Sequence, residues 1–254
     1  MKKHYVIGDV HGEYQTLLAL IEKLPKDAKL IFVGDLIDRG KESKEVIAFV
    51  KEHKHQVVLG NHENMMLEYG YKFLENLQRD GSFYRNNMWL YNGGIETLIS
   101  YGLLEKNQDG FYSPINNKEK ISEFKSDLEW IKKLPLYIKL DTPHSSGKEV
   151  VISHSNILKA WDTRNDRNEK ERFKRSAIWS REVEYLLDLS PDYEGEVFNI
   201  YGHTPQSFKP KITKNYANID TGCCYTEYDK YGRLSAYCIE SGEVVVQKNV
   251  RITE

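Results

Sequence analysis

The stretch FVGDLIDRG, residues 32–40, decides how this chain is interpreted. Apolar residues 30–33 predict a buried strand that ends at Gly34. Two carboxylates and a guanidinium, those of Asp35, Asp38 and Arg39, follow within the next six positions. Charged groups beside a buried strand are costly unless they bind something. We therefore predict a metal and phosphate site here, with Asp35 shared between two metal ions.

The composition favours a globular domain without a nucleic-acid or membrane partner. The chain has 254 residues, 40% of them hydrophobic, and a net charge of −2. No apolar run approaches the length of a membrane span, and Asp9 interrupts the N-terminus before a signal peptide could form. Three cysteines, two of them adjacent, are a poor disulfide framework, so we expect a reducing cytoplasm. The sequence leaves the oligomeric state open.

Strands alternate with helices in the first part of the chain. Residues 3–7, 30–33 and 56–59 predict strands separated by helical patterns, which indicates βαβ units. Residues from about 64 to 132 are expected to form a mostly helical, cap-like insertion. Short β-rich segments after residue 197 indicate a second sheet packed on the first. The expected fold is α/β, a central β-sandwich of two mixed sheets flanked by helices, in a single domain over residues 1–254.

One pattern occurs five times: an apolar pair, a small residue and then a potential metal ligand. The ligands in these positions are Asp9, Asp35, Asn61, His154 and His203. A single instance is more typical of a turn, but ligands in open α/β sheets collect at the carboxyl ends of strands. His11 lies two residues beyond Asp9. The joint pattern therefore favours one metal site over five unrelated turns.

The predicted ligands comprise three imidazoles, two carboxylates and one amide, without a thiolate. Such a set favours Mn, Fe or Zn in an open catalytic site over a structural zinc cage. Six side chains cannot complete two separate octahedra, so positions remain for water and substrate. Two ions that share a carboxylate are the arrangement used for in-line displacement at phosphorus.

Longer motifs carry a resemblance to a known family. They are GDVHG at 8–12, GDLIDRG at 34–40, GNHE at 60–63 and GHT at 202–204, with His154 following a strand between the last two. The chain resembles the calcineurin-like metallophosphoesterases and their fold, in the phosphoprotein phosphatase branch. The stretches WLYNGG at 89–94, WSRE at 179–182 and NIDTG at 218–222 are similar to the bacterial and phage lambda-type serine/threonine phosphatases.

The resemblance implies a role for each of these residues. The first metal would be held by Asp9, His11 and Asp35. The second would be held by Asp35, Asn61, His154 and His203. His62 would be the general acid, oriented by Asp38, because a serine alkoxide is a poor leaving group. Arg39 and Arg181 would clamp the phosphate, which Asn61 would also contact, since a guanidinium fork matches phosphoryl geometry.

The implied activity is hydrolysis of phosphoserine and phosphothreonine, with phosphotyrosine as a further substrate. Hydroxide held by two divalent metal ions, Mn first with Fe or Zn as alternatives, would attack phosphorus directly. The implied partner is a phosphorylated protein or peptide. The alternative is a symmetrical diadenosine tetraphosphate hydrolase or a related nucleotide phosphohydrolase, disfavoured by Asp38 and Glu63. A phosphodiesterase or a non-catalytic binding module accounts less well for the complete set of residues.

Three further features received a prediction. Ser155-Asn156 departs from the family, where a smaller residue is more usual after the histidine, so we expect an altered cleft beside the second metal. The charge-rich residues 159–182 are more typical of a solvated helix face than of a binding patch. Asp220 is expected to support the fold or the site without acting on substrate, and Cys223 and Cys224 to pack in the core near it.

Overall fold

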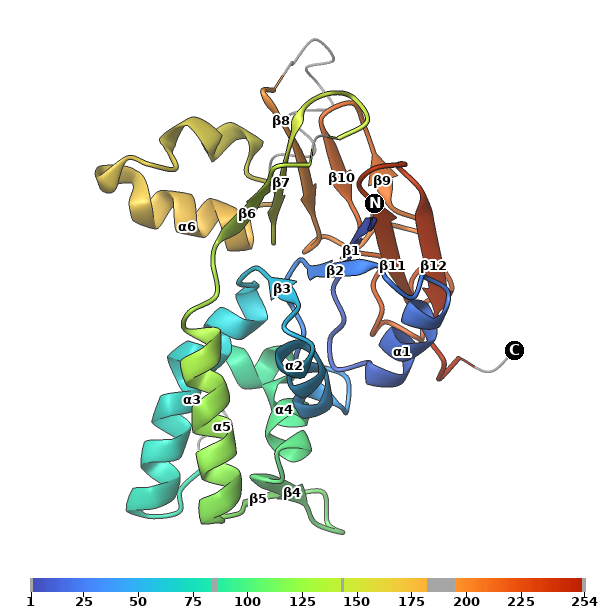
Figure 1. The fold of residues 1–254 in the computed structure, drawn as a ribbon. Coiled ribbons are helices and arrows are strands. Elements are labelled where there is room, and N and C mark those ends of the chain that lie inside the picture. Colours follow the sequence, from blue (N-terminus) through green and yellow to red (C-terminus); the bar gives the residue numbers. More distant parts are fainter. Residues whose placement is uncertain (1, 84–85, 143, 182–194, 253–254) are drawn as a thin grey trace.

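The computed structural model describes residues 2–83, 86–142, 144–181 and 195–252, and two five-stranded mixed sheets stack at its centre (Figure 1). The first has the order β12-β11-β1-β2-β3. Its strands are β1 (His4–Ile7), β2 (Lys29–Phe32), β3 (Gln56–Val57), β11 (Arg233–Cys238) and β12 (Val244–Lys248). The second has the order β6-β7-β8-β10-β9. Its strands are β6 (Tyr137–Leu140), β7 (Glu149–Ser153), β8 (Val197–Tyr201), β9 (Lys211–Ile212) and β10 (Tyr216–Asn218).

Alternation of side chains along the strands produces the layers. Val6 of β1 belongs to the core between the sheets, with Ile31, Ile152 and Ile200. Its neighbours in β1 face the other way, into the larger core beneath the helices. Successive side chains of a strand point to opposite faces, so a strand buried on both faces reads as continuously apolar. The predicted α/β sandwich of two mixed sheets is confirmed.

Helices cover the outer face of the first sheet and extend beyond it (Figure 1). Those of the first part are α1 (Tyr14–Glu22), α2 (Ser43–Glu52), α3 (Asn61–Arg79), the π-helical turn η1 (Leu90–Gly94), α4 (Ile95–Ser100) and α5 (Lys118–Ile131). The second sheet carries an arm made of η2 (Leu158–Thr163), η3 (Arg167–Glu169) and α6 (Lys170–Trp179). Among the described residues, no helix combines the length and apolar character needed to cross a bilayer.

The fold differs from the sequence prediction in two places. The expected helical insertion also contains a hairpin, β4 (Leu104–Lys106) and β5 (Tyr112–Pro114), whose turn uses Gly110 with φ of 84°. The segments after residue 197 do not all join the second sheet: β11 pairs antiparallel with β1, so β11 and β12 complete the first one. The β1–β11 pairing joins residues more than 200 positions apart, which local patterns do not reveal. The cap-like role of residues 64–132 stays a prediction.

Candidate active site

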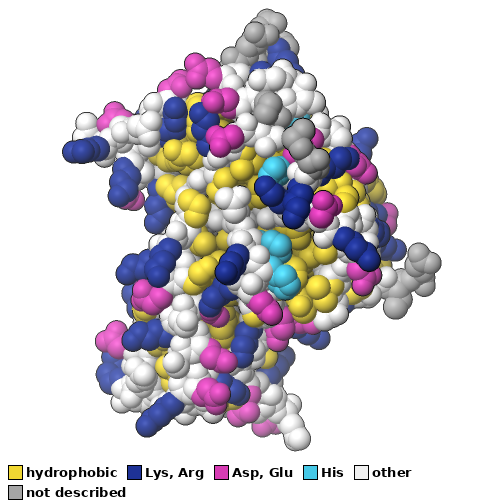
Figure 2. Space-filling view, in the orientation of Figure 1, with side chains coloured by type: hydrophobic (Ala, Val, Ile, Leu, Met, Phe, Trp, Pro, Cys, Tyr) yellow, Lys and Arg dark blue, Asp and Glu magenta, His cyan; other side chains and the backbone are white. Residues whose placement is uncertain are grey.

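The carboxyl ends of five strands meet at one edge of the sandwich. β1, β2 and β3 are parallel neighbours in one sheet, and β7 and β8 are parallel neighbours in the other. The residues that follow these strands are Asp9, Asp35, Asn61, His154 and His203, all of them buried. Figure 2 shows imidazoles near the middle of this face with Lys and Arg side chains beside them. The structure thus brings the five predicted positions together.

The backbone around the site is held in an unusual conformation. Seven described non-glycine residues have a positive φ, and five of them are the site residues His11, Asp35, Asp38, Arg39 and His203, at 49–71°. Such conformations cost of order 1–3 kcal/mol each and persist where the surroundings enforce them. They allow consecutive side chains to turn into the same small space.

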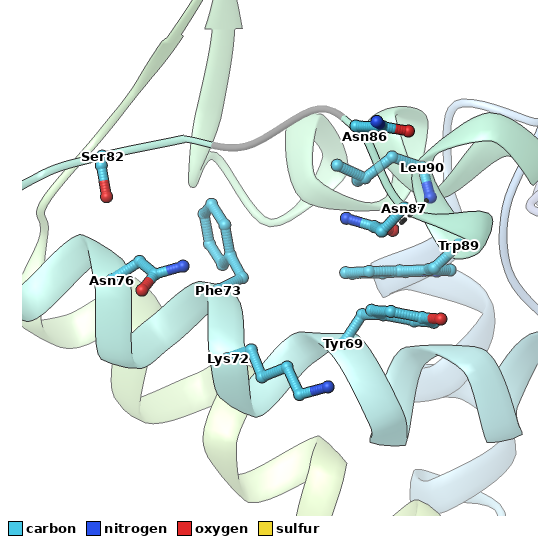
Figure 3. A pocket seen from close by; sticks show the side chains of 9 residues that line it. All are labelled: Tyr69, Lys72, Phe73, Asn76, Ser82, Asn86, Asn87, Trp89 and Leu90. Atoms are coloured by element: carbon cyan, nitrogen blue, oxygen red, sulfur yellow. Dashed lines mark hydrogen bonds between the residues drawn. The ribbon is translucent and has the colours of Figure 1, made fainter.

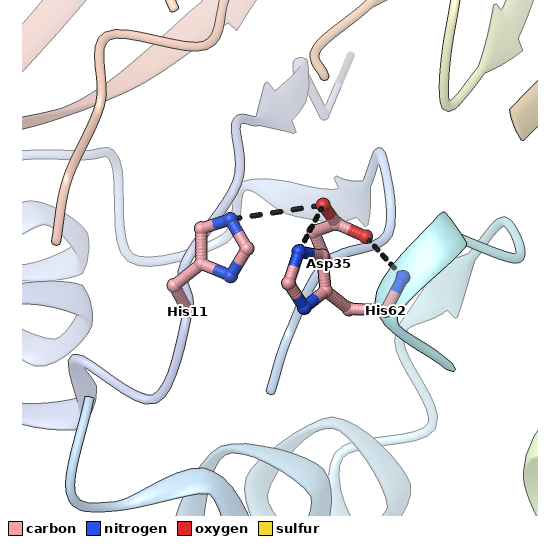
Figure 4. A group of neighbouring side chains, drawn as sticks. All are labelled: His11, Asp35 and His62. Atoms are coloured by element: carbon pink, nitrogen blue, oxygen red, sulfur yellow. Dashed lines mark hydrogen bonds and ion pairs between the residues drawn. The ribbon is translucent and has the colours of Figure 1, made fainter. Parts of the chain in front are cut away.

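The first group of potential ligands consists of His11, Asp35 and His62 (Figure 4). Asp35 Oδ2 lies 3.7 Å from His11 Nε2 and 3.9 Å from His62 Nε2. His11 Nδ1 donates to the carbonyl of Ile37 at 2.9 Å, which leaves the lone pair of its Nε2 facing the site. A ring fixed in this way is typical of metal-ligating histidines.

The second group consists of Asp35, His154 and His203, so Asp35 is common to both. His154 Nδ1 donates to the Val33 carbonyl at 2.8 Å. Its Nε2 faces Asn61 Oδ1 at 2.8 Å, His203 Nδ1 at 3.2 Å and Asp35 Oδ1 at 3.4 Å.

These contacts fit a bound cation. Burial lowers the pKa of His154, and burial together with His154 lowers the pKa of His203 to about 3, so both rings are neutral. With its Nδ1 proton donated to Val33, His154 Nε2 has only a lone pair to present to the oxygens of Asn61 and Asp35. Several lone pairs that converge on one point need a positive charge between them, and imidazole, carboxylate and amide oxygen suit Mn, Fe or Zn.

Asp9 lies at the site but outside both groups. Its two carboxylate oxygens accept from the His203 backbone N–H at 3.2 and 3.1 Å. Gly202 makes this approach feasible, because a Cβ there would lie 1.9 Å from Asp9 Oδ1. Burial, Asp220 and Asp35 raise the pKa of Asp9, and burial raises the pKa of Asp220 to about 7. Three carboxylates buried so close together again favour a cation.

His62 and Asp38 form a closed hydrogen-bonded pair. His62 Nδ1 donates to Asp38 Oδ2 at 2.6 Å, and both residues are buried. Asp38 Oδ1 accepts from the Trp89 indole at 3.0 Å and from the Thr97 hydroxyl at 2.6 Å. Burial lowers the pKa of His62, but Asp35 and Asp38 outweigh it, so that the pKa is raised. The geometry suits a proton donor whose ring Asp38 orients.

Two arginines differ in how closely they approach this cluster. Arg39 places Nη1 2.8 Å from His11 Nε2 and Nη2 3.0 Å from His62 Nε2. It also lies over the Tyr225 ring and 3.9 Å from the sulfur of Cys224. Arg181 is exposed at the rim, where its charge helps to lower the pKa of His203 after burial and His154. Glu182, the last residue of the WSRE stretch, lies outside the described residues.

Sequence reasoning assigned no role to three residues that support the site. Glu63 accepts from the backbone N–H groups of Asp35 and Leu36 at 2.8 Å each, and burial raises its pKa to about 8. Thr97 and Trp89 support Asp38 from positions 59 and 51 residues away. Trp89 was noted only as part of a family stretch; its ring also borders a cavity of about 230 Å³ beside Tyr69 (Figure 3). In the sequence, Glu63 and Trp89 stand in the motif stretches GNHE and WLYNGG, which do not show what these side chains contact. Thr97 stands in no such stretch.

Asp220 and the two adjacent cysteines lie near the site, and their contacts and burial can be compared with the predicted roles. Asp220 accepts from the Gly222 backbone N–H at 2.8 Å through Oδ1 and shapes its own loop. Cys223 is fully buried in the larger core, whereas Cys224 is only partly buried, next to Arg39. Burial raises the pKa of the Cys224 thiol to about 12.

Comparison with known proteins identifies the family of this chain. The model of the calcineurin-like phosphoesterase family matches residues 3–207. The asymmetrical bis(5'-nucleosyl)-tetraphosphatase PrpE of Geobacillus thermodenitrificans is 30% identical over 239 residues, which cover 87% of this chain and 85% of that protein.

Solved structures share the fold at low identity. A putative diadenosine tetraphosphatase has a TM-score of 0.57 at 16% identity and covers 96% of this chain and 92% of its own. A protein serine/threonine phosphatase of Saccharomyces cerevisiae has a TM-score of 0.53 at 14% identity, covering 100% of this chain and 82% of its own. Together with the family match over most of its length, the two linked histidine and carboxylate groups lead to one conclusion: this chain belongs to the calcineurin-like phosphoesterases.

Proposed function

We propose that this metallophosphoesterase is a dinuclear phosphomonoesterase that acts on phosphoserine and phosphothreonine, with phosphotyrosine as a further substrate. The observation that carries the proposal is the His62–Asp38 pair, held at 2.6 Å beside Asp35, the carboxylate that the two ligand groups share. An alkoxide leaving group needs a proton in the transition state, and a buried, oriented imidazole of raised pKa supplies one. The fold of the calcineurin-like phosphoesterases accommodates this chemistry.

The metal ligands are assigned from the family resemblance, which adds Asp9 and Asn61 to the residues of the two ligand groups and gives His62 a different role. Asp9, His11 and Asp35 would hold one divalent ion, and Asp35, Asn61, His154 and His203 the other, with Mn first and Fe or Zn as alternatives. Two ions held by these residues would neutralise phosphoryl oxygens and would lower the pKa of a water molecule to near neutrality. The chain itself orients the ligands through backbone carbonyls, as the bonds of His11 to Ile37 and of His154 to Val33 illustrate.

Binding of the phosphoryl group falls to the arginines. Arg39 lies within hydrogen-bond reach of both His11 and His62, so its guanidinium is positioned beside both imidazoles. We assign Arg39 and Arg181 to the non-bridging oxygens of the phosphate, with the Asn61 amide as a further contact. His62 then protonates the leaving oxygen, while Asp38 keeps the Nε2 of the ring directed into the cleft.

A second candidate is hydrolysis of a dinucleoside tetraphosphate into unequal halves. It is favoured by one observation, the 30% identity over 87% of the chain to a protein named as an asymmetrical bis(5'-nucleosyl)-tetraphosphatase. A nucleotide leaving group is a far weaker base than an alkoxide, so that reaction depends less on His62. The loss of turnover when His62 is replaced should therefore be large for the first candidate and small for the second.

The test compares a phosphoserine peptide with diadenosine tetraphosphate on protein loaded with Mn²⁺ in the same way. We expect a higher kcat/KM for the peptide and a steep loss of peptide turnover in His62→Asn. A preference for the dinucleotide, with ATP and AMP as products and little effect of His62→Asn, would establish the second candidate instead. ADP as the only product would indicate symmetrical cleavage.

A further inference from the structure

A second polar hollow lies beside the catalytic centre, between the segment that follows β7 and helix α6. It has a volume of about 400 Å³. Its lining side chains are Asn156, Lys159, Thr163, Arg172, Arg175 and Ser176, with Ser180 at one end. No Asp or Glu is found among the described residues that line it. The hollow thus offers cations and hydroxyls to an anion.

Asn156 provides a donor that the fold does not use. The residue is only 2% exposed. Its Oδ1 accepts from the Leu158 backbone N–H at 3.0 Å, but its buried Nδ2 has no hydrogen-bond partner among the described residues. A buried donor without an acceptor costs about 1–3 kcal/mol, and such groups in native structures call for an explanation. An anion in the hollow provides one.

The two walls of the hollow are fixed to each other and to the segment that carries the candidate metal ligand His154. Ser155, between His154 and Asn156, donates its backbone N–H to the Ala177 carbonyl at 2.8 Å and its hydroxyl to the Ser176 carbonyl at 2.5 Å. Its Oγ also accepts from the Ser180 backbone N–H at 3.1 Å. The end of α6 is therefore tied to the residue that follows a candidate metal ligand.

The hollow also continues towards the catalytic cleft. A neighbouring depression shares Arg175, Ser176 and Ser180 with it and adds Trp179 and Arg181. The Trp179 ring lies edge-on to His203 with centroids 6.2 Å apart. Positive charge thus extends from Arg181 at the rim of the site to Arg175 and Lys159. Arg172 contributes less, because it pairs with Glu169 at 3.3 Å.

We propose that this hollow is a second phosphate-binding site, in which Asn156 Nδ2, Arg175 and Lys159 bind a phosphoryl dianion next to the catalytic centre. The anion comes either from a second phosphoryl group of the substrate or from free inorganic phosphate. Its use by substrate rests on the proposed function, whereas binding of phosphate does not. The charge-rich segment 159–182, predicted to be mainly a solvated face, would then include a binding patch.

Calorimetric titration of inorganic phosphate into the metal-loaded full-length protein tests the site. We expect two binding events per chain, one weakened in Arg39→Gln and the other weakened about ten-fold or more in Asn156→Asp and Arg175→Gln. Asn156→Asp retains the oxygen that accepts from Leu158 but replaces the donor with a negative charge. Lys174→Gln is the matched control, since it removes one charge from the same helix outside this hollow. Binding that depends on Arg39 alone would overturn the proposal.

A pair of peptides then identifies the source of the anion. Peptides carry one phosphoserine, or two with varied spacing, and thermal unfolding verifies that each variant is folded. A KM about ten-fold lower for a doubly phosphorylated peptide, lost in Arg175→Gln and kept in Lys174→Gln, assigns the site to the substrate. Equal KM values with phosphate still bound assign it to free phosphate. If neither peptide is hydrolysed but two phosphate ions still bind per chain, the proposed function is wrong and the second phosphate site is still supported.

Discussion

The group of metal-ligand candidates and the His62–Asp38 pair adjoin each other at Asp35, but different parts of the molecule build them. The ligand candidates follow the ends of five strands, β1, β2, β3, β7 and β8. Asp38 instead depends on Trp89 and Thr97, which belong to the helical layer at η1 and α4. The sheet edge thus brings the potential ligands together, and the helical layer sets the orientation of the proposed proton donor.

The two regions also differ in how their polar groups are satisfied. Among the ligands, His154 Nε2 and Asn61 Oδ1 lie 2.8 Å apart with no proton to share once His154 Nδ1 donates to Val33. In the pair, both Asp38 oxygens accept hydrogen bonds from protonated donors. The first region needs a cation to be stable, whereas the second is complete as the chain folds. Substitutions should therefore separate metal binding from proton transfer.

The largest effect is expected for Asp35→Asn, because this carboxylate is common to both ligand groups. We expect turnover of aryl and alkyl phosphomonoesters to fall at least about a thousand-fold, together with loss of bound metal measured by elemental analysis. Asp27→Asn, at an exposed position, is the control. Full metal content in Asp35→Asn would show that the ligands do not depend on the shared carboxylate.

His62→Asn should reduce turnover selectively. General acid catalysis contributes about 10²–10⁴-fold, and an aryl oxide leaves with little help, so alkyl esters should lose far more than aryl esters. Metal content should stay at the unmodified level if the imidazole acts on the leaving group, as proposed, and not as a metal ligand. Equal losses on the two substrate types would place His62 among the metal ligands, as its proximity to Asp35 at 3.9 Å allows.

Trp89→Phe should reduce turnover less than His62→Asn, because it removes only one of the hydrogen bonds that hold Asp38. Loss of one hydrogen bond to a charged group, about 1.5–3 kcal/mol, should cost roughly ten-fold in kcat on alkyl esters or more. Steady-state kinetics on matched alkyl and aryl substrates measure this loss. Trp130→Phe, which changes a partly buried indole of α5, is the control. An unchanged alkyl-to-aryl ratio would show that the bonds of Asp38 to Thr97 and Ser43 suffice to keep it in place.

The ligand candidates could be predicted from the sequence, whereas the residues that support Asp38 could not. Asp9, Asp35, Asn61, His154 and His203 could be grouped because parallel strands in register end at one edge, and an apolar run followed by a small residue marks each strand end. The supports of Asp38 could not be derived, since the bonds to Trp89 and Thr97 span 51 and 59 residues and follow no period. The grouping of His62 with His11, and the position of Asp9 outside it, depend on side-chain rotamers that strand order does not determine.

The pH dependence provides the smallest and most specific test of the pair. The pKa of His62 is raised because Asp35 and Asp38 outweigh the effect of burial. His62 must be protonated to donate, so turnover of alkyl esters should fall as pH rises through its pKa. Asp38→Asn removes one of the two carboxylates, which lowers this pKa and should move the basic limb of the kcat profile to lower pH by about one unit. Aryl esters, which need no donor, should keep the same basic limb in both proteins. A basic limb that stays in place for alkyl esters would mean that another group titrates, and that Asp38 orients the ring without changing its proton affinity.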